Sequence, residues 1–522
     1  CSSATSAGGA AAWSSIAAKP VDAGAGWRRR RTPPAARGTL GCFPGIAQYG
    51  REGEDEKKAP DPHPTTNAMS HPSISEPSLK SAAHKHKIGW FTASCVLVSN
   101  VIGGGIFTTT GFMARDLGDP MLILLLWFVG ALFALGGAMV YGELGAALPH
   151  AGGDYVYLRE AYGPLVAFLS GWTSFTIGFG AALAASAVSF ASYALRVIPL
   201  TDETGWLARG LALSLLWSVT LVHCGGIGTG GRMQRLLTTI KVFAICGFIL
   251  GGLLYGSGHW AHLTTPAHES HPSLGTAAIA LLFVMYSYLG WNVASYIAGE
   301  IADPQRSLPR IMVGGIASVA GLYLLLNVVY LYALPIASLA EEPLLPVAEK
   351  AAAALWGPAS AKFVAALLCL AIAGAVSAMV WAGPRVYWAM AHDGVISPWL
   401  AQLHAGSGVP VHAILLQSAW ASLLILSGTF EQLIVYSGLV LAFFMALTLS
   451  TIFHFHRNLA TVPHFYQAPF YPFLPATLIT GALALVIYSL LQRPVESLFG
   501  AATVLSGIPL YIVWRRSHSS AS

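Results

Sequence analysis

The sequence has few charged residues and no recognisable catalytic motif. Asp, Glu, Lys and Arg make up 10% of its 522 residues, whereas hydrophobic residues make up 55% and the mean hydropathy is +0.61. It contains no HExxH, no GxSxG and no intramembrane pair of aspartates, so we expect neither an enzyme nor a metal site. This composition excludes an ordinary soluble globule and favours a membrane protein.

The six cysteines show no disulfide or metal-binding spacing. Two stand in the N-terminal region and four in or beside apolar segments, where a lone cysteine is usually a small buried hydrophobe: Cys1, Cys42, Cys95, Cys224, Cys246 and Cys369. The basic residues form no continuous stripe either, although the formal net charge is +5. We therefore expect no nucleic-acid partner and no cofactor.

The first 80 residues differ in composition from the rest. They are rich in Ala, Gly, Ser and Pro without a sustained apolar period, and we expect a disordered tail over residues 1–80. A targeting peptide is the alternative, but the segment lacks an apolar signal core. Because the first methionine is Met69, we interpret residues 1–68 as upstream sequence or a false start. A product that begins at Met69 and inserts normally would support this interpretation.

Twelve apolar stretches follow, each close to the roughly 20 residues that a spanning helix needs. We expect spans at 88–112, 120–148, 164–197, 207–223, 234–256, 275–299, 311–335, 361–390, 411–428, 431–455, 471–491 and 496–514. The predicted fold is an all-α integral membrane protein in a lipid bilayer. Its transport core covers residues 81–456, two further helices lie in 457–516, and residues 517–522 form a tail.

The distribution of basic residues predicts the orientation. One set of loops and the segment before the first span hold Lys80, Lys85, Lys87, Arg159, Arg232, Arg235, Arg306, Arg310, Arg385, Arg457, Arg515 and Arg516. The other set holds only Arg115, Arg196, Arg209, Lys350, Lys362 and Arg493. By the positive-inside rule both termini are cytoplasmic, and we expect a multi-pass protein of the cytoplasmic membrane.

Three consecutive glycines interrupt the first expected span. Gly103, Gly104 and Gly105 follow Ile102 near mid-membrane, and each glycine weakens a helix by roughly 1 kcal/mol relative to alanine. Close packing against a neighbouring helix would explain a single glycine. Three in a row favour an unwound segment, whose free N–H groups and helix dipole can bind a carboxylate.

The sixth expected span contains a second interruption, at Tyr286, Ser287, Tyr288 and Gly290. Unsatisfied backbone groups at membrane depth are costly unless they line a cavity or are buried in protein. Two breaks at the starts of two five-helix halves indicate one internal site of a transporter with inverted repeats. Carbonyl groups at the second break are predicted to bind an ammonium group, and amides at the first a carboxylate. An α-amino acid carries both groups.

A series of motifs runs in order between Ile88 and Arg457. They are Ile102 to Phe107, Tyr141 to Leu144, Gly152 to Leu158, Tyr162 to Pro164, Gly290 to Asn292, Asp303 to Pro309 and Arg385 to Gly394. Together they resemble those of the amino acid, polyamine and organocation (APC) transporter superfamily, in particular its amino acid permease and L-type exchanger branches. The block from Tyr141 to Pro164 is the most specific of them.

The resemblance implies a five-plus-five inverted repeat, at about 88–256 and 275–456, with helices 1 and 6 unwound at the substrate and two additional C-terminal helices. It also implies alternating access between the two sides of the membrane. The chain departs from the family pattern in having Gly104 where Ser or Ala is frequent, so backbone amides must replace a hydroxyl contact. The loop at 196–206 lacks the cysteine that links animal exchangers to a glycoprotein, which favours a free-standing carrier without a disulfide-linked heavy chain.

Two further side chains gain a role from the resemblance. Lys241 stands in the fifth span, where snorkelling to the cytoplasmic interface is one interpretation. The other, implied by similar permeases, is a lysine that replaces a sodium ion against helices 1 and 8 and couples transport to protons. Tyr286 lies where similar exchangers place an aromatic gate over the substrate, although packing is the common role of such a residue.

The acidic residues limit the substrate. The mid-membrane parts of spans 1, 3, 6, 8 and 10 hold no Asp or Glu that could pair with a cationic side chain, and wall residues such as Ile106 and Met379 suit a neutral one. At the cytoplasmic helix ends, the carboxylates are interpreted as pairing partners of Arg159, Arg306 or Arg310 without a chemical role. These carboxylates are Glu143, Asp154, Glu300 and Asp303.

Three functions remain open at this point. The first is a proton-coupled importer of neutral amino acids, the second is an obligate exchanger of amino acids or amines, and the third is a non-transporting membrane receptor. Flux into empty or preloaded vesicles separates the first two. A receptor would bind an amino acid without any flux.

Overall fold

The computed structural model describes residues 87–198, 205–267, 272–341, 346–428, 430–458, 466–492 and 494–519. Contacts divide the chain into two units, residues 1–73 and 74–522, and every described residue belongs to the second. The predicted tail at residues 1–80 therefore lies outside the described part. Within that part the regular structure is helical, apart from one isolated β-bridge between Ile88 and Ile301.

Nine helices of the described chain are long and apolar enough to cross a membrane, counting the interrupted first and third spans once each. Three shorter apolar helices, Leu274–Ser287, Val411–Ser427 and Phe473–Tyr488, lie at three further predicted spans. The all-helical membrane class is therefore as predicted. The count of twelve spanning helices stays a prediction.

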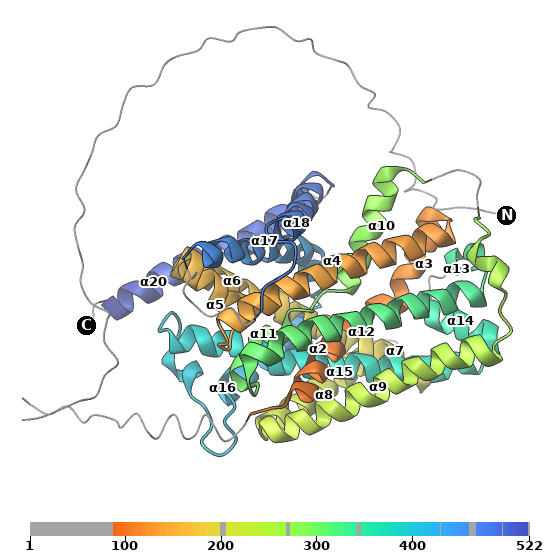
Figure 1. Cartoon of the computed structure of the whole chain (residues 1–522). Coiled ribbons are helices and arrows are strands. Elements are labelled where there is room, and N and C mark those ends of the chain that lie inside the picture. The colour runs from red at the N-terminus through yellow and green to blue at the C-terminus, as the bar shows by residue number, and fades with distance from the viewer. Residues whose placement is uncertain are drawn as a thin grey trace, which may run out of the picture. The chain divides into compact units, whose positions relative to one another are not determined.

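The helices have the following bounds (Figure 1). They are α2 (Trp90–Val101), α3 (Gly105–Leu117), α4 (Pro120–Ala147), α5 (Asp154–Tyr162), α6 (Pro164–Thr173), α7 (Gly180–Val197), α8 (Trp206–Cys224), α9 (Ile227–Tyr255), α10 (Leu274–Ser287), α11 (Val293–Tyr296), α12 (Pro304–Ala333), α13 (Ile336–Ala340), α14 (Val347–Trp356), α15 (Ser360–His392), α16 (Val411–Ser427), α17 (Phe430–Asn458), α18 (Phe473–Gln492), α19 (Pro494–Leu505) and α20 (Gly507–Ser519).

Some bounds differ from the predicted spans. α12 begins at Pro304 rather than 311, because a proline is well tolerated at the first helical position, where its missing N–H has no intrahelical acceptor. The third span contains a π-helical segment, Ser174–Phe179, between α6 and α7. α20 continues to Ser519, so part of the tail predicted from residue 517 is helical.

The first span is interrupted where the three glycines predicted it. α2 ends at Val101 and α3 begins at Gly105, and the amide of Gly103 bonds back to the carbonyl of Val101 at 2.8 Å instead of continuing the helix. The sixth span is interrupted as well. α10 ends at Ser287, and the short α11 begins at Val293 after a turn in which Gly290 has φ +92°.

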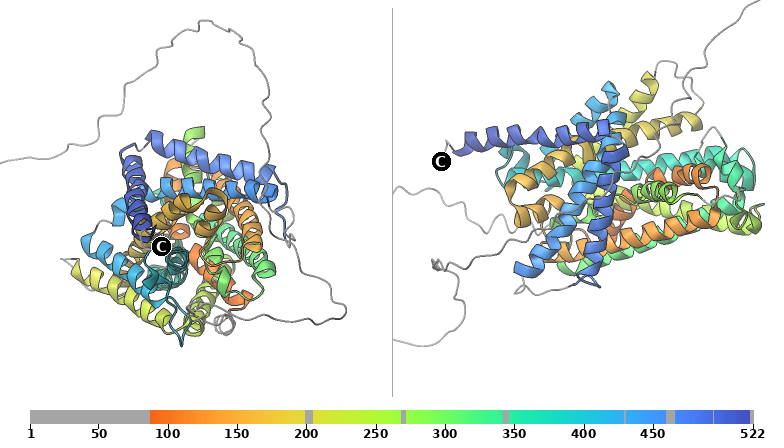
Figure 2. Two further views of the ribbon diagram at one scale, coloured as in Figure 1. Left: turned by 90° about the vertical axis from the view of Figure 1, so that its left-hand side faces the viewer. Right: turned by 90° about the horizontal axis from the view of Figure 1, so that it is seen from above.

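Small side chains allow the helices around these breaks to pack closely. α4 and α12 lie side by side, and α2 packs against α9, α12 and α15 (Figures 1 and 2). These helices carry fully buried alanines, such as Ala93 of α2 and Ala138 of α4, and small residues of this kind are usual between membrane helices. The breaks are thus held by helices on several sides.

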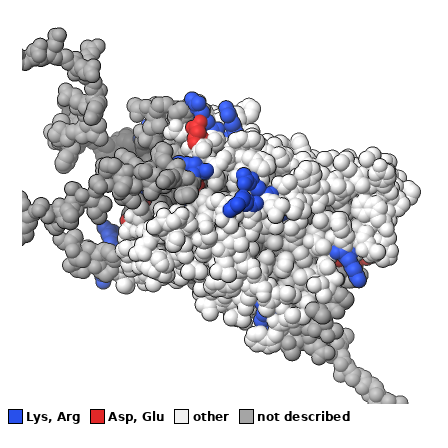
Figure 3. All heavy atoms as spheres, turned by 90° about the horizontal axis from the view of Figure 1, so that it is seen from below, with Lys and Arg blue, Asp and Glu red and all other residues white. Residues whose placement is uncertain are grey.

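Large apolar side chains lie on the outside of the bundle. Phe243 and Leu254 of α9 are 73% and 69% exposed, and Leu221 of α8 is 65% exposed. Figure 3 shows one face on which Lys, Arg, Asp and Glu leave broad areas uncharged. A surface of this kind suits hydrocarbon rather than water.

Candidate functional site

A cavity of about 270 Å³ lies at the two helix interruptions. Six of the eight substrate-binding residues predicted from the sequence line it. They are Gly103, Gly104, Gly105, Tyr286, Ser287 and Gly290. The two breaks, which are about 180 residues apart in the sequence, therefore meet at one cavity.

Ile102 and Tyr288 do not line this cavity. Ile102 is fully buried, and Tyr288 packs edge-on against Trp127 and lines a second, larger cavity. The additional wall residues come from α2, α5, α6, the π-helical segment, α7, the second break with α11, α15 and α17. Those with polar side chains are Asn100, Asp154, Ser170, Thr173, Ser174, Ser186 and Asn292.

The first break provides backbone donors. α3 starts at Gly105 directly on the cavity wall, and the amides at the start of a helix have no carbonyl of the preceding turn to bond. The helix dipole adds a partial positive charge at the same place. This arrangement is able to bind a carboxylate without any basic side chain.

Protein groups already use part of the backbone at the second break. The Asn100 side-chain amide donates to the carbonyl of Gly290 at 3.1 Å, and the hydroxyl of Tyr323 donates to the carbonyl of Ser287 at 3.2 Å. The same hydroxyl reaches the carbonyl of Val101 at 2.9 Å. One buried tyrosine therefore connects the end of α2 with the end of α10.

Replacement of Tyr323 by phenylalanine tests this connection. Tyr323→Phe removes the hydroxyl donor from the buried carbonyl of Ser287 and one of two donors from that of Val101, which keeps the amide of Gly103. An unsatisfied buried group costs roughly 1 to 3 kcal/mol, and we expect the Tm of the purified protein to fall by a few degrees. The matched control is Tyr332→Phe, whose hydroxyl makes only a 3.4 Å contact with Gly256. Equal Tm values for the two variants would contradict the assignment.

Lys241 is buried beside the first break. Its side chain is 2% exposed, and Nζ donates to the carbonyl of Ile102 at 2.9 Å, to the carbonyl of Ser99 at 3.1 Å and to Ser99 Oγ at 3.0 Å. A Cβ on Gly374 of α15 would lie 3.2 Å from Nζ, so the ammonium group lies between the first break and α15. The side chain therefore points into the bundle and does not snorkel.

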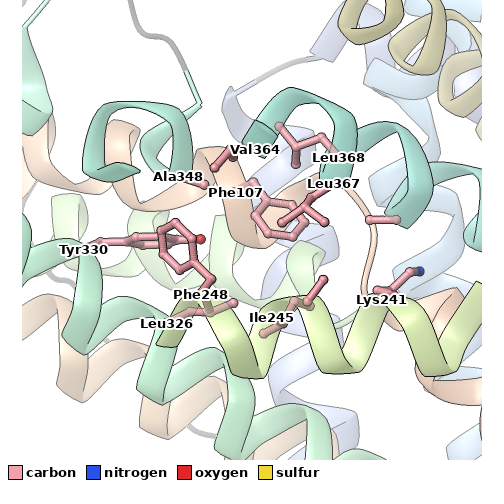
Figure 4. Close-up of a pocket in the computed structure, with 12 residues that line it drawn as sticks. Phe107, Lys241, Ile245, Phe248, Leu326, Tyr330, Ala348, Val364, Leu367 and Leu368 are labelled. Carbon is pink, nitrogen blue, oxygen red and sulfur yellow. The ribbon is translucent and has the colours of Figure 1, made fainter. Parts of the chain in front are cut away.

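A small apolar cavity of about 20 Å³ adjoins Lys241 (Figure 4). Phe107, Phe248 and Tyr330 lie on its wall, and its volume is about that of one water molecule. It is too small for an amino acid. The larger cavity at the breaks is the candidate substrate site.

Tyr286 lies between the two larger cavities. It lines the 270 Å³ cavity and also one of about 660 Å³, which Phe112 of α3 and Tyr193 of α7 line as well. The Tyr286 side chain is 52% exposed. It therefore borders the 270 Å³ cavity without covering it in this conformation.

Two of the carboxylates at the helix ends, Glu300 and Glu143, have other partners than those expected. Glu300 pairs with Arg385 at 2.6 Å and accepts from the Trp381 indole at 2.8 Å, rather than pairing with Arg306 or Arg310. Arg159 pairs with Asp393. Glu143 accepts from His456 at 2.6 Å and from the amide of Ala468 at 2.7 Å. The charge pattern alone did not identify these partners.

Asp154 and Asn100 are two of the polar wall residues that the sequence interpretation did not place at the site. Asp154 follows two glycines with positive φ in the loop after α4, and this turn brings it back onto the cavity. Asn100 directly precedes the first break and holds the second. A polar residue within an apolar span was the available signal for Asn100, whereas no local signal places Asp154.

Comparison with known proteins identifies the family of the chain. The model of the family described as amino acid permease matches residues 88–508, and the chain therefore belongs to this family of the APC superfamily. The serine/threonine exchanger SteT of Bacillus subtilis is 27% identical over 444 residues, which cover 84% of this chain and 98% of that protein. The large neutral amino acids transporter small subunit 2 of Homo sapiens is also 27% identical, with 83% and 81% covered. The Asc-type amino acid transporter 1 of Mus musculus is 26% identical, with 83% and 82% covered.

Proposed function

We propose that the chain is a secondary active transporter that carries a neutral amino acid across the cell membrane by alternating access. The observation that carries the proposal is the meeting of two broken helices at one cavity. Its volume of about 270 Å³ lies just below the range of roughly 300 to 1,000 Å³ for sites of drug-sized ligands. The names of two relatives, an exchanger of serine and threonine and a transporter of large neutral amino acids, support the same class of substrate.

The proposed binding mode uses backbone groups at both breaks. The carboxylate of the substrate accepts hydrogen bonds from amides near Gly104 and Gly105. The ammonium group of the substrate faces carbonyl groups of the turn between Ser287 and Gly290. Since some of these carbonyls already accept bonds from Asn100 and Tyr323, the ammonium group has fewer acceptors than the sequence alone suggested. Tyr286 closes over the bound molecule from the side of the larger cavity.

Proton coupling through Lys241 is the proposed energy source. A charged ammonium group holds the carbonyls of Ser99 and Ile102 together, and its deprotonation weakens that connection. Obligate exchange is the second candidate, and the similarity to SteT, named as an exchanger, favours it. The two modes use the same site.

The remaining architecture is proposed with the function. It comprises twelve spanning helices, a core of two inverted five-helix repeats at about 88–256 and 275–456, and two additional C-terminal helices. Both termini lie in the cytoplasm, so that the end of the bundle at which α2 begins, here called the α2 end, is cytoplasmic. The carrier works without a disulfide-linked heavy chain.

Uptake into proteoliposomes tests the proposal. Neutral amino acids should compete with a labelled neutral substrate, and lysine and arginine should compete at least tenfold more weakly. An acid-outside gradient that drives uptake into empty vesicles supports symport, whereas uptake only into preloaded vesicles supports exchange. Saturable binding with no flux in either case would contradict a transport function.

A further inference from the structure

Asp154 is a buried carboxyl group without a basic partner. Its side chain is 9% exposed, and Oδ2 accepts from the hydroxyl of Tyr296 at 2.8 Å and from the Asn292 side-chain amide at 3.4 Å. Oδ1 is buried and has no hydrogen-bond partner within the described chain. Within the described chain no Lys, Arg or His pairs with this carboxyl group.

The groups that face Asp154 are neutral. They are the phenols of Tyr141 from α4, Tyr157 from its own helix α5 and Tyr296 from α11, together with the amide of Asn292. A carboxylate buried among such groups is poorly solvated, and burial raises the pKa of Asp154 above its ordinary value. The hydrogen bond from Tyr296 acts in the opposite direction, because it stabilises the charged form.

The hydrogen bond between Tyr296 and Asp154 connects α5 with α11, an element that moves in the proposed transport cycle. α11 is the inner half of the broken sixth span, and the turn before Asp154 is fitted to it: the amide of Gly152 donates to the carbonyl of Tyr296 at 3.0 Å, and the Tyr296 ring lies against Gly153. Access to the substrate cavity from this side requires α11 to separate from α5. Separation would bring water to the carboxyl group.

Other contacts close the same end of the bundle in this conformation. Ile88, just before α2, exchanges backbone hydrogen bonds with Glu300 and Ala302 at 2.8 and 2.9 Å. Glu300 in turn pairs with Arg385 of α15. Meanwhile the 660 Å³ cavity lies on the other side of Tyr286. The α2 end is thus the closed end here, and Asp154 lies among the contacts that close it.

We propose that Asp154 is a proton-binding group of the gate at the α2 end: it holds a proton while α11 is closed onto α5, and it releases that proton to water when α11 moves away. This inference rests on the proposed transport function and adds a second protonation site to it. Asp154 acts through the position of α11 and is therefore a positioning residue.

The direction of the pH effect follows from comparing the Asp154 carboxyl group in the closed gate with the same group exposed to water in the open gate. The carboxyl group binds its proton more tightly in the closed conformation than in water, so protonation stabilises the closed gate. This stabilisation is present at low pH on the α2 side and is lost as that pH rises through the raised pKa. One proton changes the ratio of closed to open gates by at most about tenfold per pH unit.

Transport measured at different pH values inside proteoliposomes of known orientation tests the proposal. With the α2 end facing the lumen, exchange of a labelled amino acid by the wild type should rise several-fold as the internal pH increases from about 5 to about 8. Asp154→Asn, which cannot lose a proton, should remove this dependence. Asp116→Asn makes the same chemical change at an exposed aspartate next to Arg115 and should keep it.

Tyr296→Phe provides a second variant that retains the carboxyl group. Because the lost hydrogen bond stabilised the carboxylate, the midpoint of the pH profile should move to higher pH. The proposal is overturned if Asp154→Asn keeps the wild-type profile, if the wild type shows no dependence on internal pH, or if Tyr296→Phe leaves the midpoint unchanged. Absence of any flux in the wild type would instead count against the proposed transport function.

Discussion

Lys241→Met should lower amino acid uptake at least tenfold and abolish its response to a proton gradient. The variant keeps a side chain of similar length but removes three hydrogen bonds to Ser99 and Ile102, at 2.9 to 3.1 Å. Hydrogen bonds to charged groups contribute roughly 1.5 to 3 kcal/mol each, and about 1.4 kcal/mol corresponds to a tenfold change. The shape of the first break depends on these bonds, so the effect should reach substrate binding.

The measurement compares initial uptake rates with and without an acid-outside gradient, in proteoliposomes with equal amounts of inserted protein. Lys350→Met is the matched control, because the Lys350 ammonium group contacts carbonyls near Glu341, away from the substrate cavity. It should transport at close to the wild-type rate. If Lys241→Met retained both uptake and its gradient dependence, the role given to Lys241 would be wrong.

Gly290→Ala is the second substitution with a large expected effect. Gly290 has φ +92°, a conformation that costs an alanine roughly 1 to 3 kcal/mol, and a Cβ at this position would overlap the side-chain amide of Asn100. The substitution therefore strains the second break and displaces the residue that holds it. We expect uptake to fall at least tenfold, with a higher KM.

Gly314→Ala serves as the control for Gly290→Ala. It makes the same chemical change within α12, where a Cβ meets no other atom within 4 Å. Uptake kinetics of this variant should match the wild type, and its Tm should not fall. A Gly290→Ala protein with wild-type KM and maximal rate would show that the second break does not depend on this turn.

The sequence was sufficient to predict the two breaks because glycine and polar residues act locally. Gly103 to Gly105 cannot maintain a stable helix without side chains, and Gly290 adopts a backbone conformation that other residues avoid. Hydropathy predicted the long spans for a similar reason, because a spanning helix satisfies its backbone N–H and C=O groups within its own segment. Both kinds of prediction need no knowledge of neighbouring helices.

The partners across the bundle could not be predicted in the same way. Whether Lys241 snorkels or points inward depends on the room beside Gly374, which lies about 130 residues further along the chain. Asp154 reaches the cavity only because the turn at Gly152 and Gly153 folds back onto α11. Likewise, Glu300 selects Arg385 of α15 over nearer arginines in the sequence. Tertiary packing determines all three.

Protection of a cysteine at the first break tests the central claim most directly. Gly104→Cys places a thiol on the wall of the 270 Å³ cavity, where no atom lies within 4 Å of the added Cβ. The native cysteines are replaced by alanine in this variant. We predict that a transported neutral amino acid slows maleimide labelling of this thiol, with half-protection near its KM for uptake. Gly89→Cys, at the start of α2 and outside the cavity, should be labelled at the same rate with and without substrate. Unchanged labelling of Gly104→Cys at a saturating concentration of a transported amino acid would contradict substrate binding at the two breaks.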